Sequence, residues 1–91
     1  MVAWRVEGRK WDLLLETLMF RLASDDGREV MCGITQIAIN DYYRTEDSRD
    51  AAQANFEKHM EDIVRMAARL IDDGASNERG VYLITSQVIG N

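Results

Sequence analysis

The sequence contains no proline, one cysteine and one histidine among its 91 residues. A single cysteine excludes an internal disulfide framework, and one cysteine with one histidine cannot supply the four ligands of a structural zinc site. The phosphate loops GxGxxG and GxxxxGK(S/T) and the nucleophile motif GxSxG are missing as well. We therefore expect no metal and no cofactor, and the sequence shows no catalytic constellation that would favour an enzyme.

Basic residues are also few, with 11 Lys and Arg against 16 Asp and Glu and a net charge of −5. A phosphate backbone repels such a chain, so nucleic acid is not an expected partner. The longest uncharged stretch, Val30 to Asn40, is broken by Gly33 and is too short to span a bilayer, which takes about 20 apolar residues. No secretory signal is visible and the lone thiol suits a reducing compartment, so we expect a cytoplasmic protein without membrane contact.

The overall amino-acid composition is typical of one small globular domain. Hydrophobic residues make up 46% of the chain and charged residues 30%, as in ordinary soluble domains. We assign residues 1–91 to a single domain, because domains usually hold about 100–200 residues. A chain of this length buries only roughly 60% of the surface that its unfolded form exposes, so its core must be thin.

The clearest periodic pattern runs from Ser48 to Asp73 and predicts one long amphipathic helix. Thr45, Asp47 and Ser48 are candidate N-caps, and Gly74 suits the left-handed position that ends a helix. Charged residues occupy the opposite side of the helix. The apolar stripe consists of Ala52, Phe56, His59, Met60, Ile63, Ala67, Leu70 and Ile71.

Before this helix, the sequence predicts a β-hairpin with strands at Thr17–Ala23 and Arg28–Ile34. The connection Ser24-Asp25-Asp26-Gly27 contains Asp-Gly, a strong turn signal. Thr35 can cap a short helix from Gln36 to about Tyr43. The hairpin residues expected to face the long helix are Leu18, Phe20, Leu22, Val30, Cys32 and Ile34.

The two ends of the chain add further strands. Val81–Ile89 is rich in β-branched and aromatic residues and reads as a strand with two apolar faces. Trp4-Arg5-Val6 suits an edge strand, and Trp11–Glu16 suits either a helical turn or the rest of that strand. We therefore predict a two-layer α+β fold, in the order (β)-β-β-α-α-β. Its three- or four-stranded, mainly antiparallel sheet is packed by one long and one short helix.

One helix covers only one face of such a sheet, which leaves the other face to be explained. Either the N-terminal segment, including Leu13-Leu14-Leu15, folds over it, which is the simpler arrangement, or the face meets another molecule. We therefore expect a non-enzymatic interaction module that binds itself, as a homodimer, or another protein. The last strand contributes either Tyr82 and Ile84 or Val81 and Leu83. The predicted interface residues are Trp4, Trp11, Met19, Met31, Tyr82 and Ile84.

The alternative function is a small-molecule-binding or regulatory domain. Its cleft would lie near Cys32, Tyr42, Asn55 and His59. A carboxylate such as Asp62 could orient the imidazole for proton transfer, although a surface pair on the helix explains it equally. An inward cysteine within a strand ordinarily behaves as a small hydrophobic residue.

Several short motifs follow one another in a recognisable order. They are Phe20-x-x-Ala23, Asp26-Gly27-x-x-Val30-x-Cys32-x-Ile34-Thr35, Ala38-Ile39-x-Asp41-Tyr42, Asn55 with Ile63–Ala67, and Val81-x-Leu83-Ile84-Thr85. This series, spanning Trp11 to Val88, resembles a short family of unknown function found mainly in proteobacteria. The resemblance implies a small cytoplasmic α+β domain and brings no activity, cofactor or catalytic residue. The family often has an arginine after the helix asparagine, where Phe56 and Glu57 stand here.

Overall fold

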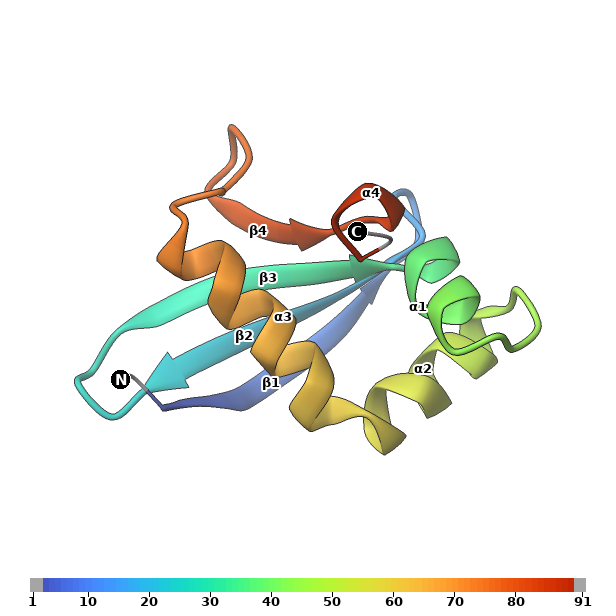
Figure 1. Ribbon diagram of the computed structural model, residues 1–91, viewed down its shortest axis with the longest axis horizontal. Coiled ribbons are helices and arrows are strands. Elements are labelled where there is room, and N and C mark those ends of the chain that lie inside the picture. Colours follow the sequence, from blue (N-terminus) through green and yellow to red (C-terminus); the bar gives the residue numbers. More distant parts are fainter. Residues whose placement is uncertain (1–2, 90–91) are drawn as a thin grey trace.

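The structure, a computed structural model, describes residues 3–89 as one twisted sheet with helices on one side (Figure 1). The elements in chain order are β1 (Trp4–Asp12), β2 (Thr17–Ser24), β3 (Glu29–Thr35), α1 (Gln36–Tyr42), α2 (Arg49–Lys58), α3 (Met60–Asp72), β4 (Val81–Ile84) and α4 (Ser86–Ile89). The sheet order is β1-β2-β3-β4. Strands β1 to β3 are antiparallel, and β4 joins β3 in parallel. The predicted α+β class is confirmed.

Local signals place the hairpin and the first helix where the sequence predicts them. Gly27 adopts φ +87° in the turn between β2 and β3, a conformation that glycine reaches without strain. The side chain of Thr35 accepts a hydrogen bond from the Ala38 amide and so caps α1. Gly74, at φ +65°, ends α3 in the same left-handed conformation.

The single long helix predicted over Ser48–Asp73 is wrong, because two helices meet at an angle there (Figure 1). His59 leaves the helical conformation, with φ −119° and ψ 29°. Its ring stacks on Tyr43, at 3.8 Å between ring centroids. The bend lets α2 pack beside α1 while α3 crosses the sheet, so one apolar stripe covers two surfaces that a straight helix could not both reach.

The strand predicted over Val81–Ile89 is also too long. Strand β4 ends at Ile84, which pairs with Ile34, and its neighbour β3 ends one residue further on. Beyond that point no strand is left to accept or donate ladder hydrogen bonds. The chain satisfies its backbone instead in the short helix α4, where the Ile89 amide donates to the Thr85 carbonyl.

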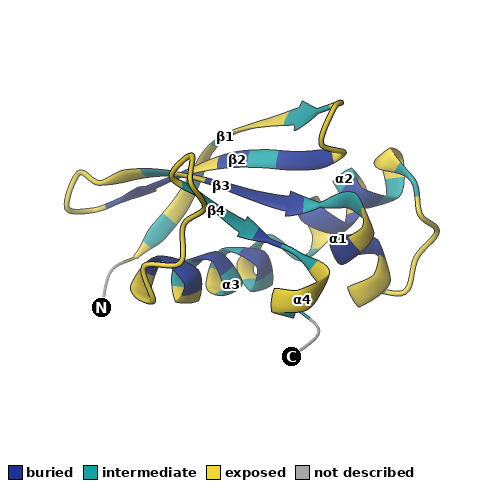
Figure 2. Cartoon of the chain, turned by 90° about the horizontal axis from the view of Figure 1, so that it is seen from above, coloured by how far each residue is buried: buried dark blue, intermediate teal, exposed yellow. Residues whose placement is uncertain are grey.

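The core lies between the sheet and the helices (Figure 2). At its centre the rings of Phe20 and Phe56 meet at 5.1 Å between centroids. No described helix covers the opposite face of the sheet in Figure 2. The expectation that the N-terminal segment folds over that face is wrong, because this segment forms β1 and extends the sheet sideways.

Candidate functional site

The sheet face turned away from the helices, called here the outer face, carries an apolar patch. Gly33 lies at its centre, paired with Met19 on β2 and Leu83 on β4. A Cβ atom at Gly33 would lie only 3.0–3.1 Å from side-chain atoms of Met19, Leu83 and Thr17. The missing side chain therefore allows these neighbours to close over the backbone. The patch consists of Met19, Met31, Val81 and Leu83.

A hollow of about 420 Å³ lies beside this patch, where β1 contains a bulge between Val6 and Gly8. The cations at its rim differ in their partners. The Arg21 guanidinium lies 3.6 Å from the carboxylate of Glu29, whereas the ammonium group of Lys10 makes no ion pair or hydrogen bond with the described residues. The residues that line the hollow are Gly8, Arg9, Lys10, Met19, Phe20, Arg21 and Met31.

The turn between β1 and β2 displays three consecutive leucines. Leu13, Leu14 and Leu15 are 72%, 96% and 56% exposed. The turn is nevertheless well held, because the Leu15 amide donates to the Asp12 carboxylate at 3.0 Å and the Thr17 hydroxyl donates to the Leu15 carbonyl at 2.8 Å. Acidic side chains, Asp12 and Glu16, flank the leucines on both sides. An ordered apolar turn at the surface is typical of a contact site.

The strand register divides the six predicted interface residues between the two faces of the sheet. Met19 and Met31 lie on the outer face. Trp4 and Trp11 pair with Ser24 and Leu18 and so belong to the helix side, where Arg28 and Arg49 lie over their rings. Tyr82 and Ile84 also face the helices, since they pair with Cys32 and Ile34. The expectation that these two residues reach the outer face is corrected to Val81 and Leu83.

The four predicted ligand-binding residues do not share one cleft. Cys32 is fully buried in the core, and this burial raises the pKa of its thiol to about 12. A thiol with such a pKa is a poor nucleophile at neutral pH. Tyr42 is half exposed and lines a groove beside α3, whereas His59 lines a different, smaller hollow.

Asn55 takes part in a buried network of hydrogen bonds that holds the loop between α1 and α2. Its amide donates to the side-chain oxygens of Asn40, at 3.1 Å, and Thr45, at 2.8 Å. Asn40 in turn donates to the Ser48 carbonyl at 2.9 Å. The sequence reasoning missed Asn40, because nothing in its spacing distinguishes a buried asparagine from an exposed one at a helix end.

His59 is occupied by its stacking contact with Tyr43, whose ring plane is inclined by only 6° to the imidazole. The Tyr43 hydroxyl is buried and has no hydrogen-bond partner among the described residues. Burial, together with the nearby carboxylate of Asp62, raises the pKa of Tyr43 to about 12. The hydroxyl therefore stays protonated at neutral pH, and the pair forms a packed joint between helices.

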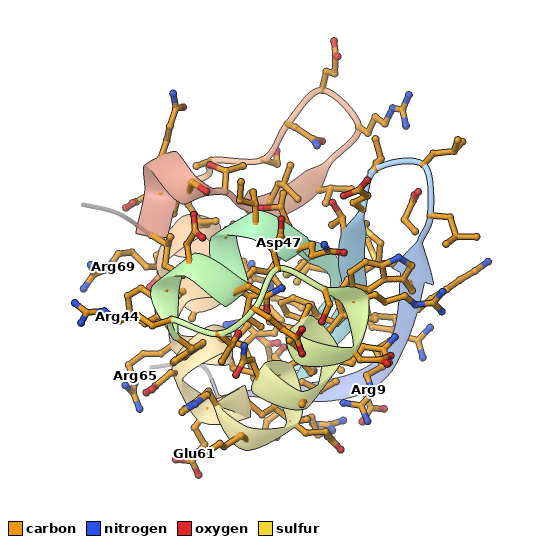
Figure 3. All side chains as sticks on the ribbon, turned by 90° about the vertical axis from the view of Figure 1, so that its right-hand side faces the viewer. Arg9, Arg44, Asp47, Glu61, Arg65 and Arg69 are labelled. Atoms are coloured by element: carbon orange, nitrogen blue, oxygen red, sulfur yellow. The ribbon has the colours of Figure 1, made fainter. Side chains whose placement is uncertain are left out.

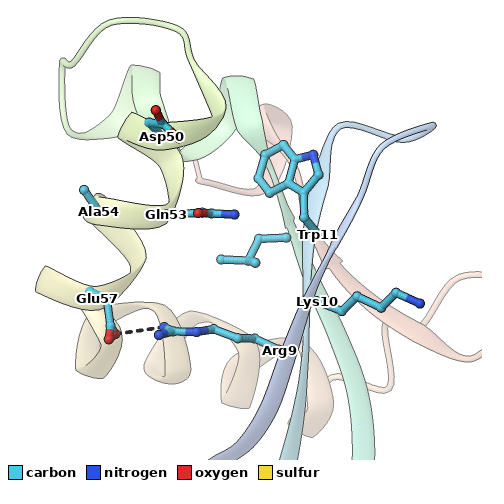
Figure 4. Close-up of a pocket in the computed structure, with 8 residues that line it drawn as sticks. Arg9, Lys10, Trp11, Asp50, Gln53, Ala54 and Glu57 are labelled. Atoms are coloured by element: carbon cyan, nitrogen blue, oxygen red, sulfur yellow. Dashed lines mark hydrogen bonds and ion pairs between the residues drawn. The ribbon is translucent and has the colours of Figure 1, made fainter.

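A cleft of about 470 Å³ separates the end of β1 from α2 (Figure 4). Arg9 reaches across it and donates to Glu57 at 2.8 Å. This hydrogen bond lowers the pKa of Glu57 below its ordinary value and raises the pKa of Arg9 above its ordinary value. Because the two groups satisfy each other, they join β1 to α2, and neither is available as a free acid or base. The lining consists of Arg9, Lys10, Trp11, Leu18, Asp50, Gln53, Ala54 and Glu57.

Within residues 3–89, no three histidine, cysteine or acidic side chains gather closely enough to hold a metal ion. In the same part of the chain, every helix is too short or too polar to span a bilayer.

Comparison with known proteins identifies relatives of the fold. A family model described as "Protein of unknown function (DUF1488)" matches residues 6–84. The chain is similar to a crystal structure of a DUF1488-family protein of unknown function from Shewanella loihica PV-4, with a TM-score of 0.76 and 23% identity over 91% of this chain and 90% of that chain. No curated protein matches. The resemblance drawn from the hairpin and helix motifs is confirmed.

Proposed function

The chain belongs to the DUF1488 family, whose function is unknown, and we propose that it is a non-enzymatic cytoplasmic interaction module that self-associates through its outer face. The observation that carries this proposal is the apolar patch of Met19, Met31, Val81 and Leu83, which no described element covers. Burial of apolar area is the main favourable term in protein association. A second copy of the chain would supply an equal apolar face.

The size of the outer face suits a weak homodimer. Strands about 4.8 Å apart, with a rise of about 3.3 Å per residue, give a four-stranded face of roughly 400 Å². Two such faces in contact cover roughly 800 Å², which falls among the weak and transient interfaces below about 1,200 Å². We therefore expect a reversible dimer, with a dissociation constant on the order of micromolar.

Charge complementarity supports a second copy rather than an unrelated partner. The hollow beside the patch is apolar with Lys10 and Arg21 at its rim, whereas the leucine turn is apolar with Asp12 and Glu16 beside it. Opposite charges around matching apolar surfaces favour association and fix its register. One chain thus carries both halves of such a contact, and a two-fold dimer would form it twice.

Light-scattering mass measured across the micromolar range tests this proposal. We expect the mass to rise with concentration, and Met31→Lys to weaken association about tenfold or more, because the dimer would bury an unpaired ammonium group. Val88→Lys is the matched control. Val88 is as exposed as Met31, at 40% against 41%, but it lies on α4, on the helix side.

A second variant examines the leucine turn separately. Leu14 is almost fully exposed in the monomer, so Leu14→Asp should leave folding unchanged and weaken association if the turn enters the hollow of a second copy. A chain that stays monomeric throughout the range refutes self-association. If the Met31→Lys and Val88→Lys variants associate equally strongly, self-association does not occur through the outer face.

A further inference from the structure

A second concave surface lies on the helix side, between α3, the end of α1 and α4. Its volume of about 620 Å³ lies within the range of small-molecule sites. Apolar side chains come from all three helices, whereas the charged ones come only from α3 and the residue that caps its end. The groove is lined by Tyr42, Asp62, Arg65, Met66, Arg69, Leu70, Asp73, Val88 and Ile89.

The two arginines that line this groove differ in whether their guanidinium groups form ion pairs. Arg65 donates to the Asp62 carboxylate at 2.9 Å, but the guanidinium of Arg69, one helical turn further on, makes no hydrogen bond or ion pair with the described residues. A cation in the last turn of a helix is favourable by itself. This interaction with the helix dipole explains a cation at the end of α3, but it does not explain why the Arg69 side chain lines a groove that has an apolar wall. Arg44, Arg65 and Arg69 project from the same side of the molecule (Figure 3).

We propose that the groove binds a small monoanion that carries an apolar chain or an aromatic ring, such as a medium-chain carboxylate. Two arginines and two aspartates line the groove. Arg65 is paired with Asp62, whereas the guanidinium of Arg69 makes no ion pair with the described residues, so a single negative charge suits the site. The free guanidinium of Arg69 provides paired donors for a carboxylate. The side chains of α4 and α1 that line the groove would cover the apolar part of the ligand.

Amide chemical shifts, followed by NMR on the full chain during a titration with sodium octanoate, test the proposal. We expect saturable shifts at Tyr42, Met66, Arg69 and Val88. Sodium acetate, which has the charge alone, and 1-octanol, which has the chain alone, should produce much smaller shifts at equal concentration. Equal shifts from 1-octanol, or octanoate shifts confined to the outer face, would overturn the proposal.

Variants separate binding from folding. Arg69→Ala should raise the octanoate dissociation constant about tenfold, the effect of losing one charge-assisted hydrogen bond. The matched control is Arg79→Ala, which removes an exposed arginine from the loop before β4 and should leave binding unchanged. Equal affinities of the Arg69→Ala and Arg79→Ala variants would refute the site.

Discussion

Replacing Asn40 with alanine tests whether the buried amide network holds the loop between α1 and α2. The Asn40 side chain is fully buried and takes part in three hydrogen bonds. It donates to the Ser48 carbonyl at 2.9 Å and accepts from Asn55 at 3.1 Å and from Thr45 at 3.3 Å. Alanine removes all three bonds at once.

The structure sets the size of the expected effect. Each intramolecular hydrogen bond contributes about 1 kcal/mol net, so Asn40→Ala should cost about 3 kcal/mol. The cost stays near this value because the partners are not stranded. The Ser48 carbonyl still accepts from the Ala52 amide, and Asn55 still donates to Thr45. A domain of this length is stable by roughly 5–14 kcal/mol, so the loss is a substantial fraction of the total.

Urea unfolding, followed by circular dichroism and tryptophan fluorescence, measures this loss. With an m-value of about 1.5 kcal/mol per molar, the midpoint should fall by about 2 M at unchanged slope. Asn77→Ala is the matched control, since Asn77 accepts two hydrogen bonds in an exposed loop and should cost about 1 kcal/mol or less. If Asn40→Ala costs no more than Asn77→Ala, the buried amide network does not stabilise the loop between α1 and α2.

Two further predictions concern titratable groups. Cys32 should resist alkylation in the folded chain at pH 8 and react once urea unfolds it, because burial raises the pKa of its thiol to about 12; rapid native-state labelling would contradict the buried position. The Arg9 hydrogen bond lowers the pKa of Glu57, so the stability that this carboxylate contributes should be complete above its ordinary pKa of 4.5 and disappear as the pH falls through its lower native value. Thermal melts should therefore show a flatter acid limb for Glu57→Gln, and an unchanged limb would exclude the pair as a source of acid sensitivity.

The elements that the sequence predicts well carry their signals within a few residues. The Asp-Gly turn requires only the local conformation of Gly27, and the cap at Thr35 requires only an oxygen beside the first free amides of α1. Gly74 ends α3 for the same local reason. These interactions form between near neighbours whatever the rest of the chain does, so pattern reasoning can identify them.

The elements that it predicts poorly depend on distant partners. The break at His59 follows from contact with Tyr43, 16 residues earlier in the chain, and from the two surfaces that α2 and α3 must cover. The end of β4 at Ile84 follows from the end of its neighbour, β3. No periodicity within Val81–Ile89 or Ser48–Asp73 contains this information.

The candidate sites show the same division. Met19 and Met31 are identifiable because the hairpin register follows from its turn. Arg69 carries no sequence signal, since charged residues near helix ends are common at surfaces. Its significance depends on α4 closing a groove beside α3, which the structure alone reveals.

The sequence by itself determined the α+β class, the hairpin, the helix cap at Thr35, the helix end at Gly74 and the presence of more apolar residues than one helix layer can cover. Tertiary structure alone decided which side of the sheet each residue of β4 takes, because a strand's two faces are chosen by its register with a neighbour. It placed Val81 and Leu83 outside and Tyr82 and Ile84 inside. Apolar content is a property of the chain, whereas the face that remains open is a property of the pairing.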